Sequence, residues 1–388
     1  MHVNLRWAIF IAAVLAISAF GFSLLEPATG DTVSANAVLS DIGGDISGYA
    51  RATEPLDWQF PRDFGAHPEY QTEWWYYTGN LEGADGRRFG YQFTIFRRAI
   101  SPETQTSSSE WRANQLYMAH FAVTDVAGEA FYHEQRFSRG GANLAGAQAD
   151  PRYRVWLEDW QVIALDDSAE TTRITASMAD VSVDLTLTQI KPPALQGDMG
   201  LSAKSEEPGN ASHYYSLTRL LTEGTITIGD VVHSVSGASW KDHEFSTSAL
   251  GSTALGWDWF GLQFDDQREM MVGQIRQVDG GRDPYFGGLL IQPDGSTRYL
   301  PADSFTIEAT ASWTSPHTGA EYPAGWVITV DIGEAEPLRL TVTPQIADQE
   351  LTGGDIAYWE GTVRISGDVT GYGYAELTGY VDAMTGRF

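Results

Sequence analysis

EGTITIGD, residues 223–230, recurs as EGTVRISGD at residues 360–368. Two further pairs of short matches keep the same order along the chain: LTLTQI at residues 185–190 with LTVTPQI at residues 340–346, and WYYTG at residues 75–79 with WDWFG at residues 257–261. Matches that recur in one order are typical of a duplicated unit. The sequence therefore predicts two similar domains in tandem, over residues 57–246 and 247–388.

Both predicted domains are rich in strand-like segments. Each contains about eight runs in which Val, Thr, Ile, Tyr and Trp alternate with polar residues, separated by Gly, Asp and Pro. In YQFTIFRR, residues 91–98, one face of the strand is apolar and the opposite face is partly apolar as well. This pattern predicts an all-β protein of two antiparallel barrels, each able to enclose one small ligand. A two-sheet sandwich with a filled core is the alternative.

The amino terminus predicts export. Residues 8–25, AIFIAAVLAISAFGFSLL, are uncharged and apolar, which suits either a signal peptide within residues 1–30 or a membrane anchor helix. Residues 31–56 show no apolar period and are interpreted as a linker. Both alternatives place the domains outside the cytoplasm, in the periplasm or secreted. The chain has no cysteine, which excludes disulfides, thiolate metal sites and a lipidated cysteine.

Composition and missing motifs exclude several classes of function. The 51 acidic and 24 basic residues give a net charge of -27, which disfavours nucleic acid as a partner. No Walker or Rossmann pattern occurs, so no cofactor is predicted. His67, Glu69 and Glu73 leave a metal role open beside capping or an ordinary loop, and no HExxH or EF-hand pattern supports a metal site elsewhere. The absence of GxSxG disfavours a serine hydrolase.

SWKDHEF, residues 239–245, concentrates ionisable side chains between two aromatic ones. As a regular strand it places its side chains alternately on two faces: Trp240, Asp242 and Glu244 on one, and Lys241, His243 and Phe245 on the other. Two enclosed carboxylates at i and i+2 raise each other's pKa and supply an acid and a base. The alternative is a polar seam that joins the two domains.

Several longer stretches resemble one known family: FPRDFGAHPEYQTEWWYYTGNLEG, AHFAVTD, HYYSLTRLLTEGTITIG, GASWKDHEF and GWDWFGLQF. They are similar to the lipocalin-like proteins that include carotenoid 1,2-hydratase (hydroxyneurosporene synthase, CrtC) and the AttH proteins. The resemblance implies two lipocalin-like barrels, an extracytoplasmic setting and, in the hydratase branch, cofactor-free addition of water to an isoprenoid double bond. In the AttH branch it implies a secreted hydrolase or a companion of an export transporter.

The same resemblance implies two site residues. The histidine that the hydratases use two positions before an aromatic residue falls on His243, with Phe245 where the enzymes have tryptophan. Their aspartate after an aromatic residue falls nearest to Asp258, between Trp257 and Trp259. A regular strand would turn Asp258 away from both tryptophans unless a bulge intervenes.

We predict Asp242, His243 and Asp258 as catalytic residues around one site at the domain junction. Residues 246–256, STSALGSTALG, are small and flexible enough to let the flanking strands approach each other. Alkene hydration needs a proton donor, an aromatic cage for the carbocation and a positioned water, and the sequence has candidates for all three.

Aromatic and polar residues in and beside these stretches supply the predicted ligand-binding set. Its members are Glu73, Trp75, Tyr77, His120, Tyr215, Trp240, Phe245, Trp257 and Trp259, with Trp74 and Tyr214 as further candidates. The alternative for aromatic residues in a barrel is a place in the packed core, and for His120 a hydrogen-bonded core position.

Three functions remain open at this point. The first is a hydratase-like hydro-lyase, the second a noncatalytic carrier or chaperone that works with an ABC transporter permease, and the third a structural envelope protein. The prediction that unites the first two is a hydrophobic small-molecule partner, either an isoprenoid or a lipid.

Overall fold

The structure is a computed structural model that describes residues 46–102, 109–247, 250–354 and 356–384. Almost all regular structure in these segments is antiparallel β-strand, which confirms the predicted all-β class. None of the helices in the described segments has the length and apolar character needed to cross a membrane. The predicted signal or anchor segment at residues 8–25 lies outside the described residues.

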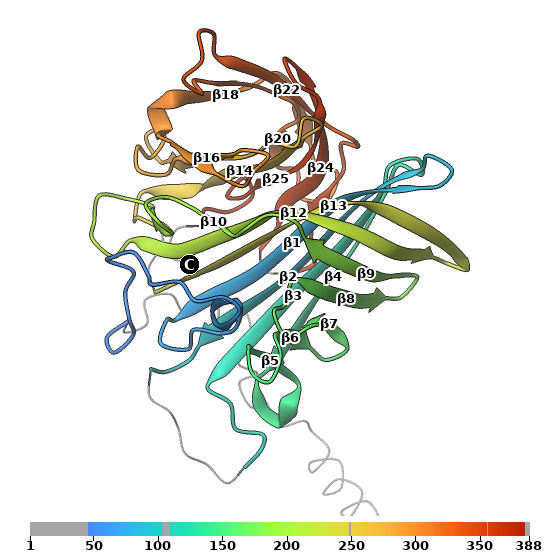
Figure 1. Cartoon of the computed structure of the whole chain (residues 1–388), viewed down its shortest axis with the longest axis vertical. Helices are drawn as coiled ribbons and strands as arrows, with labels where there is room; N and C mark the ends of the chain where they lie inside the picture. Colours follow the sequence, from blue (N-terminus) through green and yellow to red (C-terminus); the bar gives the residue numbers. More distant parts are fainter. Residues whose placement is uncertain (1–45, 103–108, 248–249, 355, 385–388) are drawn as a thin grey trace, which may run out of the picture. The chain divides into compact units, whose positions relative to one another are not determined.

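The N-terminal half forms a nearly closed barrel (Figure 1). Its strands are β1 (Thr72–Gly83), β2 (Arg88–Ala99), β3 (Gln115–Asp125), β4 (Ala130–Arg139), β5 (Ala145–Gln148), β6 (Arg154–Leu157), β7 (Trp160–Ala164), β8 (Thr171–Met178), β9 (Val181–Gln189), β10 (Ala194–Leu195), β11 (Leu201–Ala203), β12 (Ala211–Ile228) and β13 (Val231–Ser246). They pair in the order β4-β3-β2-β1-β13-β12-β9-β8-β7-β6-β5, with β10 and β11 both paired to β12. Two short 3-10 helices, η1 (Arg62–Phe64) and η2 (Gly141–Asn143), accompany the sheet.

The C-terminal half forms the second barrel. Its strands are β14 (Ala254–Phe264), β15 (Glu269–Gln277), β16 (Gly288–Ile291), β17 (Thr297–Leu300), β18 (Phe305–Ala309), β21 (Trp326–Val330), β22 (Leu338–Pro344), β23 (Glu350–Leu351), β24 (Tyr358–Gly367) and β25 (Gly371–Leu377). They pair in the order β17-β16-β15-β14-β25-β24-β22-β21-β18, and β23 pairs with β24. A separate hairpin of β19 (Ser312–Thr314) and β20 (Glu321–Pro323) and the 3-10 helix η3 (Ala302–Ser304) complete this half.

The two sheets repeat one strand order, which explains the sequence repeats. In each sheet the first four strands run in sequence to one edge, and the last strand, β13 or β25, pairs with the first, β1 or β14. WYYTG and WDWFG lie on β1 and β14, while EGTITIGD and EGTVRISGD begin on β12 and β24. The prediction of two tandem barrels is confirmed. The sheets occupy residues 72–246 and 254–377, and the domain limits proposed from the sequence stay a prediction.

Strand alternation points large side chains into the interior of each barrel. On β1, Trp75 and Tyr77 point into the barrel and join its buried core, whereas Tyr76 belongs to a different buried cluster that contains Trp259 and Tyr374 from the second barrel. Large side chains fill much of the interior of the N-terminal barrel, and the void beside Phe64, Tyr77 and Lys241 measures about 10 Å³. A ligand cavity inside this barrel stays a prediction. The outward face of β1 is buried against the other barrel.

A buried cluster of three charged residues, Lys191, Arg219 and Glu269, connects the two barrels. Glu269 on β15 is fully buried, and one of its oxygens lies 2.7 Å from Lys191 Nζ while the other bonds Arg219. The β12 register shifts between Leu217 and Leu220, and such a bulge redirects side chains. Arg219 lies within this bulge and reaches across to Glu269 of the other barrel.

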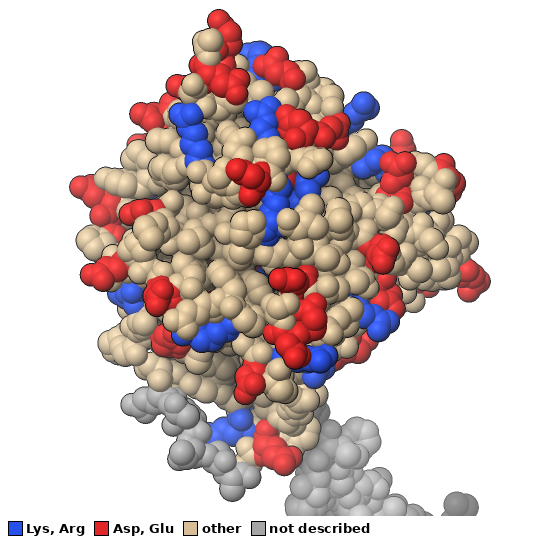
Figure 2. All heavy atoms as spheres, viewed as in Figure 1, with Lys and Arg blue, Asp and Glu red and all other residues tan. Residues whose placement is uncertain are grey.

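Among the charged side chains on the visible surface, acidic ones are more common than basic ones (Figure 2). Figure 2 shows the acidic side chains scattered over one face, with basic side chains standing between them singly or in small groups. This distribution agrees with the excess of acidic residues in the chain.

Candidate functional site

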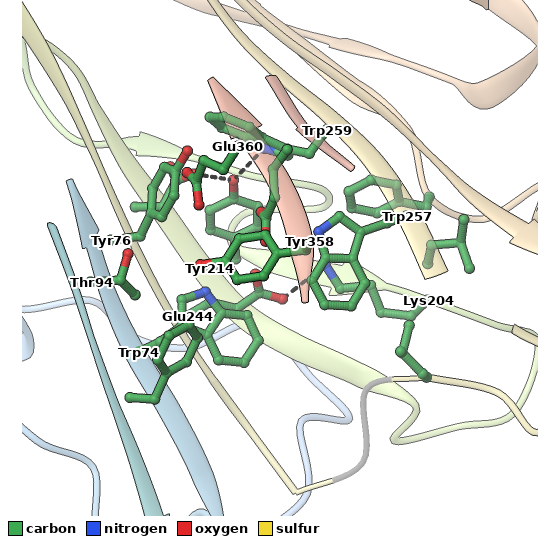
Figure 3. Close-up of a pocket in the computed structure, with 16 residues that line it drawn as sticks. Trp74, Tyr76, Thr94, Lys204, Tyr214, Glu244, Trp257, Trp259, Tyr358 and Glu360 are labelled. Atoms are coloured by element: carbon green, nitrogen blue, oxygen red, sulfur yellow. Dashed lines mark hydrogen bonds and ion pairs between the residues drawn. The ribbon is translucent and has the colours of Figure 1, made fainter. Parts of the chain in front are cut away.

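A cavity of about 80 Å³ lies where the outer faces of the two barrels meet. We call it the inter-barrel cavity. Figure 3 shows Trp74, Tyr76, Tyr214 and Glu244 of the N-terminal barrel around it, together with Trp257, Trp259, Tyr358 and Glu360 of the C-terminal barrel. Its lining consists of Trp74, Tyr76, Thr94, Phe96, Lys204, Tyr214, Asp242, Glu244, Leu250, Trp257, Trp259, Ile275, Phe286, Tyr358, Glu360 and Glu376. The cavity thus combines aromatic walls with four carboxyl groups.

Strand register places two of these carboxyl groups side by side on β13. Asp242 pairs with Tyr76 of β1 and with Ser216 of β12, and Glu244 pairs with Tyr214. Because side chains alternate along a strand, Asp242 and Glu244 share the outward face of the barrel. This confirms the alternation predicted for SWKDHEF.

Asp242 is a buried carboxyl group held by three donors. The Tyr214 hydroxyl donates to it at 2.8 Å, Ser216 Oγ at 2.5 Å and Trp240 Nε1 at 2.7 Å. Burial raises the pKa of Asp242 to about 7, and the charge of Glu244 adds to the rise, while the three donors lower it in part. Asp242 therefore titrates close to neutral pH and can act as either an acid or a base.

Glu244 is already paired. Lys204 Nζ lies 2.8 Å from Glu244 Oε1, and Ser212 also donates to this oxygen. The same ammonium group lies 4.4 Å from the ring centroid of Phe286. Lys204 is the single basic residue among the described lining residues, so the cavity holds more acidic groups than cations.

Glu360 and Glu376 form a second carboxyl pair, on β24 and β25. They occupy directly opposed positions in the antiparallel register, where like charges repel. Burial and the charge of Glu376 raise the pKa of Glu360 well above its usual range, and the nearby hydroxyls of Tyr76 and Tyr358 counteract this only in part. Burial also raises the pKa of Glu376 to about 7. At neutral pH this pair therefore carries at least one proton.

The Glu360 carboxyl group makes no hydrogen bond of normal geometry to any described residue, although the hydroxyls of Tyr76 and Tyr358 lie close enough to lower its pKa in part. It is 1% exposed, and within the described parts of the chain neither oxygen has a hydrogen-bond partner. The same holds for the Tyr76 hydroxyl. Behind this group, His120 Nδ1 lies 2.6 Å from the Tyr358 hydroxyl. A protonated carboxyl group with this freedom can donate its proton to whatever enters the cavity.

The three residues predicted as catalytic do not share one site. Asp242 lines the inter-barrel cavity, His243 points into the N-terminal barrel, and Asp258 bonds Arg276 and Tyr380 on the other side of β14 from Trp257 and Trp259. The prediction of a common site is wrong, because consecutive residues of a strand face opposite sides. Their catalytic roles stay predictions.

His243 belongs to a buried polar network at the mouth of the N-terminal barrel. Its Nε2 lies 2.8 Å from Glu73 Oε1, and its Nδ1 lies 3.0 Å from the Tyr215 hydroxyl. His67 Nδ1 lies 2.9 Å from the same Glu73 oxygen, and Arg97 Nε donates to the other at 2.8 Å. Burial lowers the pKa of His243 to about 4, despite the opposing effect of Glu73. The neutral imidazole thus donates to Glu73 and accepts from Tyr215.

This network also contains a cluster with metal-binding residue types. Ligand atoms of His67, Glu73 and His243 lie within 4.8 Å of one another. However, Arg97 already balances the Glu73 carboxylate. Burial lowers the pKa of His67, but hydrogen bonds to Asp63 and Glu73 raise it to about 9, so a second cation is present. We therefore interpret the cluster as a self-contained polar network.

Lys241 is buried inside the same barrel. Its Nζ donates to the Tyr215 hydroxyl at 3.0 Å and lies 4.6 Å from the ring centroids of Phe64 and Tyr153. Aromatic faces favour an ammonium ion, but burial outweighs them and lowers the pKa of Lys241 well below its usual range. Lys241 is therefore a destabilising residue at neutral pH.

We expect Lys241→Met to be neutral or stabilising, by up to about 4 kcal/mol, as when buried charged groups are replaced by apolar ones. A lysine whose folded pKa is depressed is destabilising until its unfolded form also loses its proton, near pH 10.4. The stability difference between the two proteins should therefore shrink as pH rises toward 10. Denaturant titrations across this range measure it, and a variant that is less stable at pH 7 would contradict the interpretation.

The predicted ligand-binding residues fall into two groups. Trp257 and Trp259 line the inter-barrel cavity, Trp240 donates to Asp242 beside it, and His120 bonds Tyr358 of its lining. The rest lie in the N-terminal barrel or at its mouth, away from the cavity: Glu73, Trp75, Tyr77, Tyr215 and Phe245. A ligand role for this second group stays a prediction without a cavity to support it.

The polar lining residues that were not predicted include Lys204, Tyr358, Glu360 and Glu376. The sequence contained one signal, and it concerned Glu360. In AYWEGTV, Glu360 alternates with Trp359, so it lies on the strand face opposite to a core tryptophan. A carboxylate on that face is ordinarily solvated, and only the contact with the other barrel buries it.

Comparisons with known proteins agree with this architecture. The family model described as AttH-like matches residues 51–380. The crystal structure of an AttH candidate from Nitrosomonas europaea is 33% identical with a TM-score of 0.76, over 86% of this chain and 100% of that one. Kievitone hydratase from Nectria haematococca is 14% identical with a TM-score of 0.64, over 86% of this chain and 96% of that one, a likeness of fold alone. A search of curated proteins finds no match.

Proposed function

The chain belongs to the AttH-like family, and from this premise we propose that it binds an isoprenoid or lipid group in the inter-barrel cavity and adds water to its double bond without a cofactor. The observation that carries the proposal is the Glu360 carboxyl group, buried and unpartnered within the described residues, in a cavity walled by tryptophan and tyrosine. An acid kept neutral by burial is a proton donor at pH 7.

The proposed reaction begins with transfer of the Glu360 proton to the less substituted alkene carbon. A C–H bond forms and a tertiary carbocation remains, which the faces of Trp257, Trp259 and Tyr76 stabilise. The oxygen of a water molecule then bonds to the cationic carbon and loses a proton to Glu376 or Asp242, whose pKa values near 7 suit a base. If Glu376 is the base, proton exchange with the opposed Glu360 restores the acid; if Asp242 is the base, it releases its proton to solvent and Glu360 takes one up from solvent. The product is a tertiary alcohol.

The size of the cavity limits the substrate. Pockets for drug-sized ligands usually measure about 300–1,000 Å³, whereas this one measures about 80 Å³. It therefore accommodates one small branched end of a longer molecule, and the rest of that molecule would lie outside the present cavity. This fits an isoprenoid terminus better than a bulky ring system.

We expect the purified protein to yield an apolar molecule on extraction with organic solvent, detected by mass spectrometry. Incubation with isoprenoid alkenes in D₂O should give a tertiary alcohol with one carbon-bound deuterium, because the transferred proton comes from an exchangeable carboxyl group. Recovery of the alkene unchanged, with binding intact, would identify a noncatalytic carrier, the alternative that includes a partnership with an export transporter. Failure to bind any apolar molecule would refute both.

The proposed location is extracytoplasmic, periplasmic or secreted, and anchoring by the amino-terminal segment is part of this proposal. It rests on the apolar run at residues 8–25. Fractionation of cells that produce the full chain tests it, with recovery from the cytoplasm as the contrary result.

A further inference from the structure

We propose that the inter-barrel cavity recognises positive charge, and that its preferred ligand is a protonated amine on an apolar body. This inference rests on the proposed function, since both use the same cavity. The two proposals differ in the cation: here it is a stable cationic ligand, whereas the hydration reaction forms only a transient carbocation. Three features of the cavity support it independently of catalysis.

The first feature is an unmet need for hydrogen-bond donors. Glu360 is 1% exposed, and both of its oxygens lack a partner among the residues that the structure describes. Buried carboxyl groups are normally hydrogen-bonded, and leaving one unsatisfied is costly. The N–H groups of an ammonium ion would supply donors, in a charge-assisted bond that is stronger than a neutral one.

The second feature is the imbalance of charge around this group. Glu376 faces it from β25, and Asp242 and Glu244 lie on β13 across the cavity. Lys204 is the one cation in the described lining, and it already pairs with Glu244 at 2.8 Å. None of the other three carboxyl groups, Glu360, Glu376 and Asp242, is paired with a cation in the described lining, although Asp242 already accepts three hydrogen bonds.

The third feature is the aromatic wall. Tyr76, Tyr214, Trp257, Trp259 and Tyr358 surround the carboxyl groups (Figure 3). Cations bind over such ring faces, and the attraction grows when water is excluded. Aromatic rings with one or more carboxyl groups form a recognised kind of site for alkylammonium groups.

Binding of a cation should be coupled to proton release. An ammonium ion beside Glu360 favours its ionised form, so the proton that this group holds in the empty cavity would leave. The other titratable groups that line the cavity are Glu376 on β25, Asp242 and Glu244 on β13, Tyr76 on β1, Tyr214 on β12, Tyr358 on β24, and Lys204. A neutral ligand of the same shape would release no proton.

The test compares hexylammonium with 1-hexanol by isothermal titration calorimetry near pH 7, in phosphate and in Tris. These buffers differ in ionisation enthalpy, so the difference in heat reports the protons released. We expect hexylammonium to bind at least about tenfold more tightly than hexanol, with release of up to about one proton per ligand. Glu360→Gln should abolish both the preference and the proton release.

Glu223→Gln is the matched control, because Glu223 holds the equivalent place in EGTITIGD but is exposed. It should behave as wild type. Equal binding of hexanol and hexylammonium would overturn the charge preference while leaving the hydrophobic ligand site standing. If neither hexanol nor hexylammonium bound, the charge preference would be overturned as well. The proposed function is tested separately, by solvent extraction and deuterium incorporation. If Glu360→Gln does not fold, the wild-type protein alone tests the proposal: it should release protons on binding hexylammonium, and the absence of release would contradict the proposal.

Discussion

Glu360→Gln is expected to reduce turnover of an isoprenoid alkene by about 10² to 10⁴, the usual contribution of a positioned acid. The amide preserves the shape of the side chain but has no acidic proton to transfer. Stability should be unchanged or slightly higher, because the substitution removes a buried ionisable group that lacks partners. Steady-state kinetics and thermal unfolding of the same preparations measure the two effects.

The pH profile gives this prediction a second readout. In the proposed reaction the acid is Glu360, whose pKa lies well above its usual range, and the bases are Asp242 and Glu376, whose pKa values lie near 7. Turnover should therefore rise as pH increases through about 7 and fall again at higher pH. Glu223→Gln should retain the wild-type rate and profile. A Glu360→Gln protein with normal turnover would exclude this residue as the acid.

The fold could be predicted because its evidence is local. Strand period, turn residues and the repeated segments such as EGTITIGD and EGTVRISGD all depend on short stretches of chain. The alternation of side chains along residues 239–245 followed from the same rule, and the structure confirms it.

The candidate site could be predicted only in part because it forms where two outer barrel faces meet. Glu223 and Glu360 occupy equivalent places in the repeat, yet Glu223 is exposed and Glu360 is 1% exposed. Only the packing of one barrel on the other distinguishes them, and no local pattern records which faces touch. Asp242 was found because its own motif is unusual, whereas Glu360 looks like an ordinary surface carboxylate.

The common site predicted for Asp242, His243 and Asp258 fails for a related reason. Proximity along the chain brings β13 and β14 together, but it does not override alternation within each strand. The resemblance supplied His243 and Asp258, and strand parity then sends them into separate barrels. Parity was the stronger physical constraint.

Glu73→Gln is expected to destabilise the protein by about 3–5 kcal/mol, the usual cost of removing one partner from a buried ion pair. Glu73 is fully buried and Arg97 is 1% exposed, so Arg97 would be left in the core without a counter-charge. Glutamine keeps one acceptor oxygen, so it cannot satisfy His67, His243 and Arg97 together. Urea titration monitored by tryptophan fluorescence measures the loss.

The dependence on pH follows from the sign of the shift. The interaction with Arg97 and the bonds from both histidines outweigh burial and hold the pKa of Glu73 below its usual range. A carboxylate with a depressed folded pKa stabilises the protein above its unfolded pKa, near 4.3, and this contribution is lost as pH falls further. The difference between wild type and Glu73→Gln should therefore be full at pH 7 and narrow below about pH 4.

Glu82 on the same strand provides the matched control. It forms an ion pair with Arg88, but its side chain is 52% exposed. Glu82→Gln should cost no more than about 1 kcal/mol. A double-mutant cycle with Arg97→Met isolates the Glu73–Arg97 coupling, which should be large and favourable. If Glu73→Gln instead left stability intact and abolished ligand binding, Glu73 would be the ligand-binding residue that the sequence predicted, and the polar network would have to be reinterpreted as a second binding site.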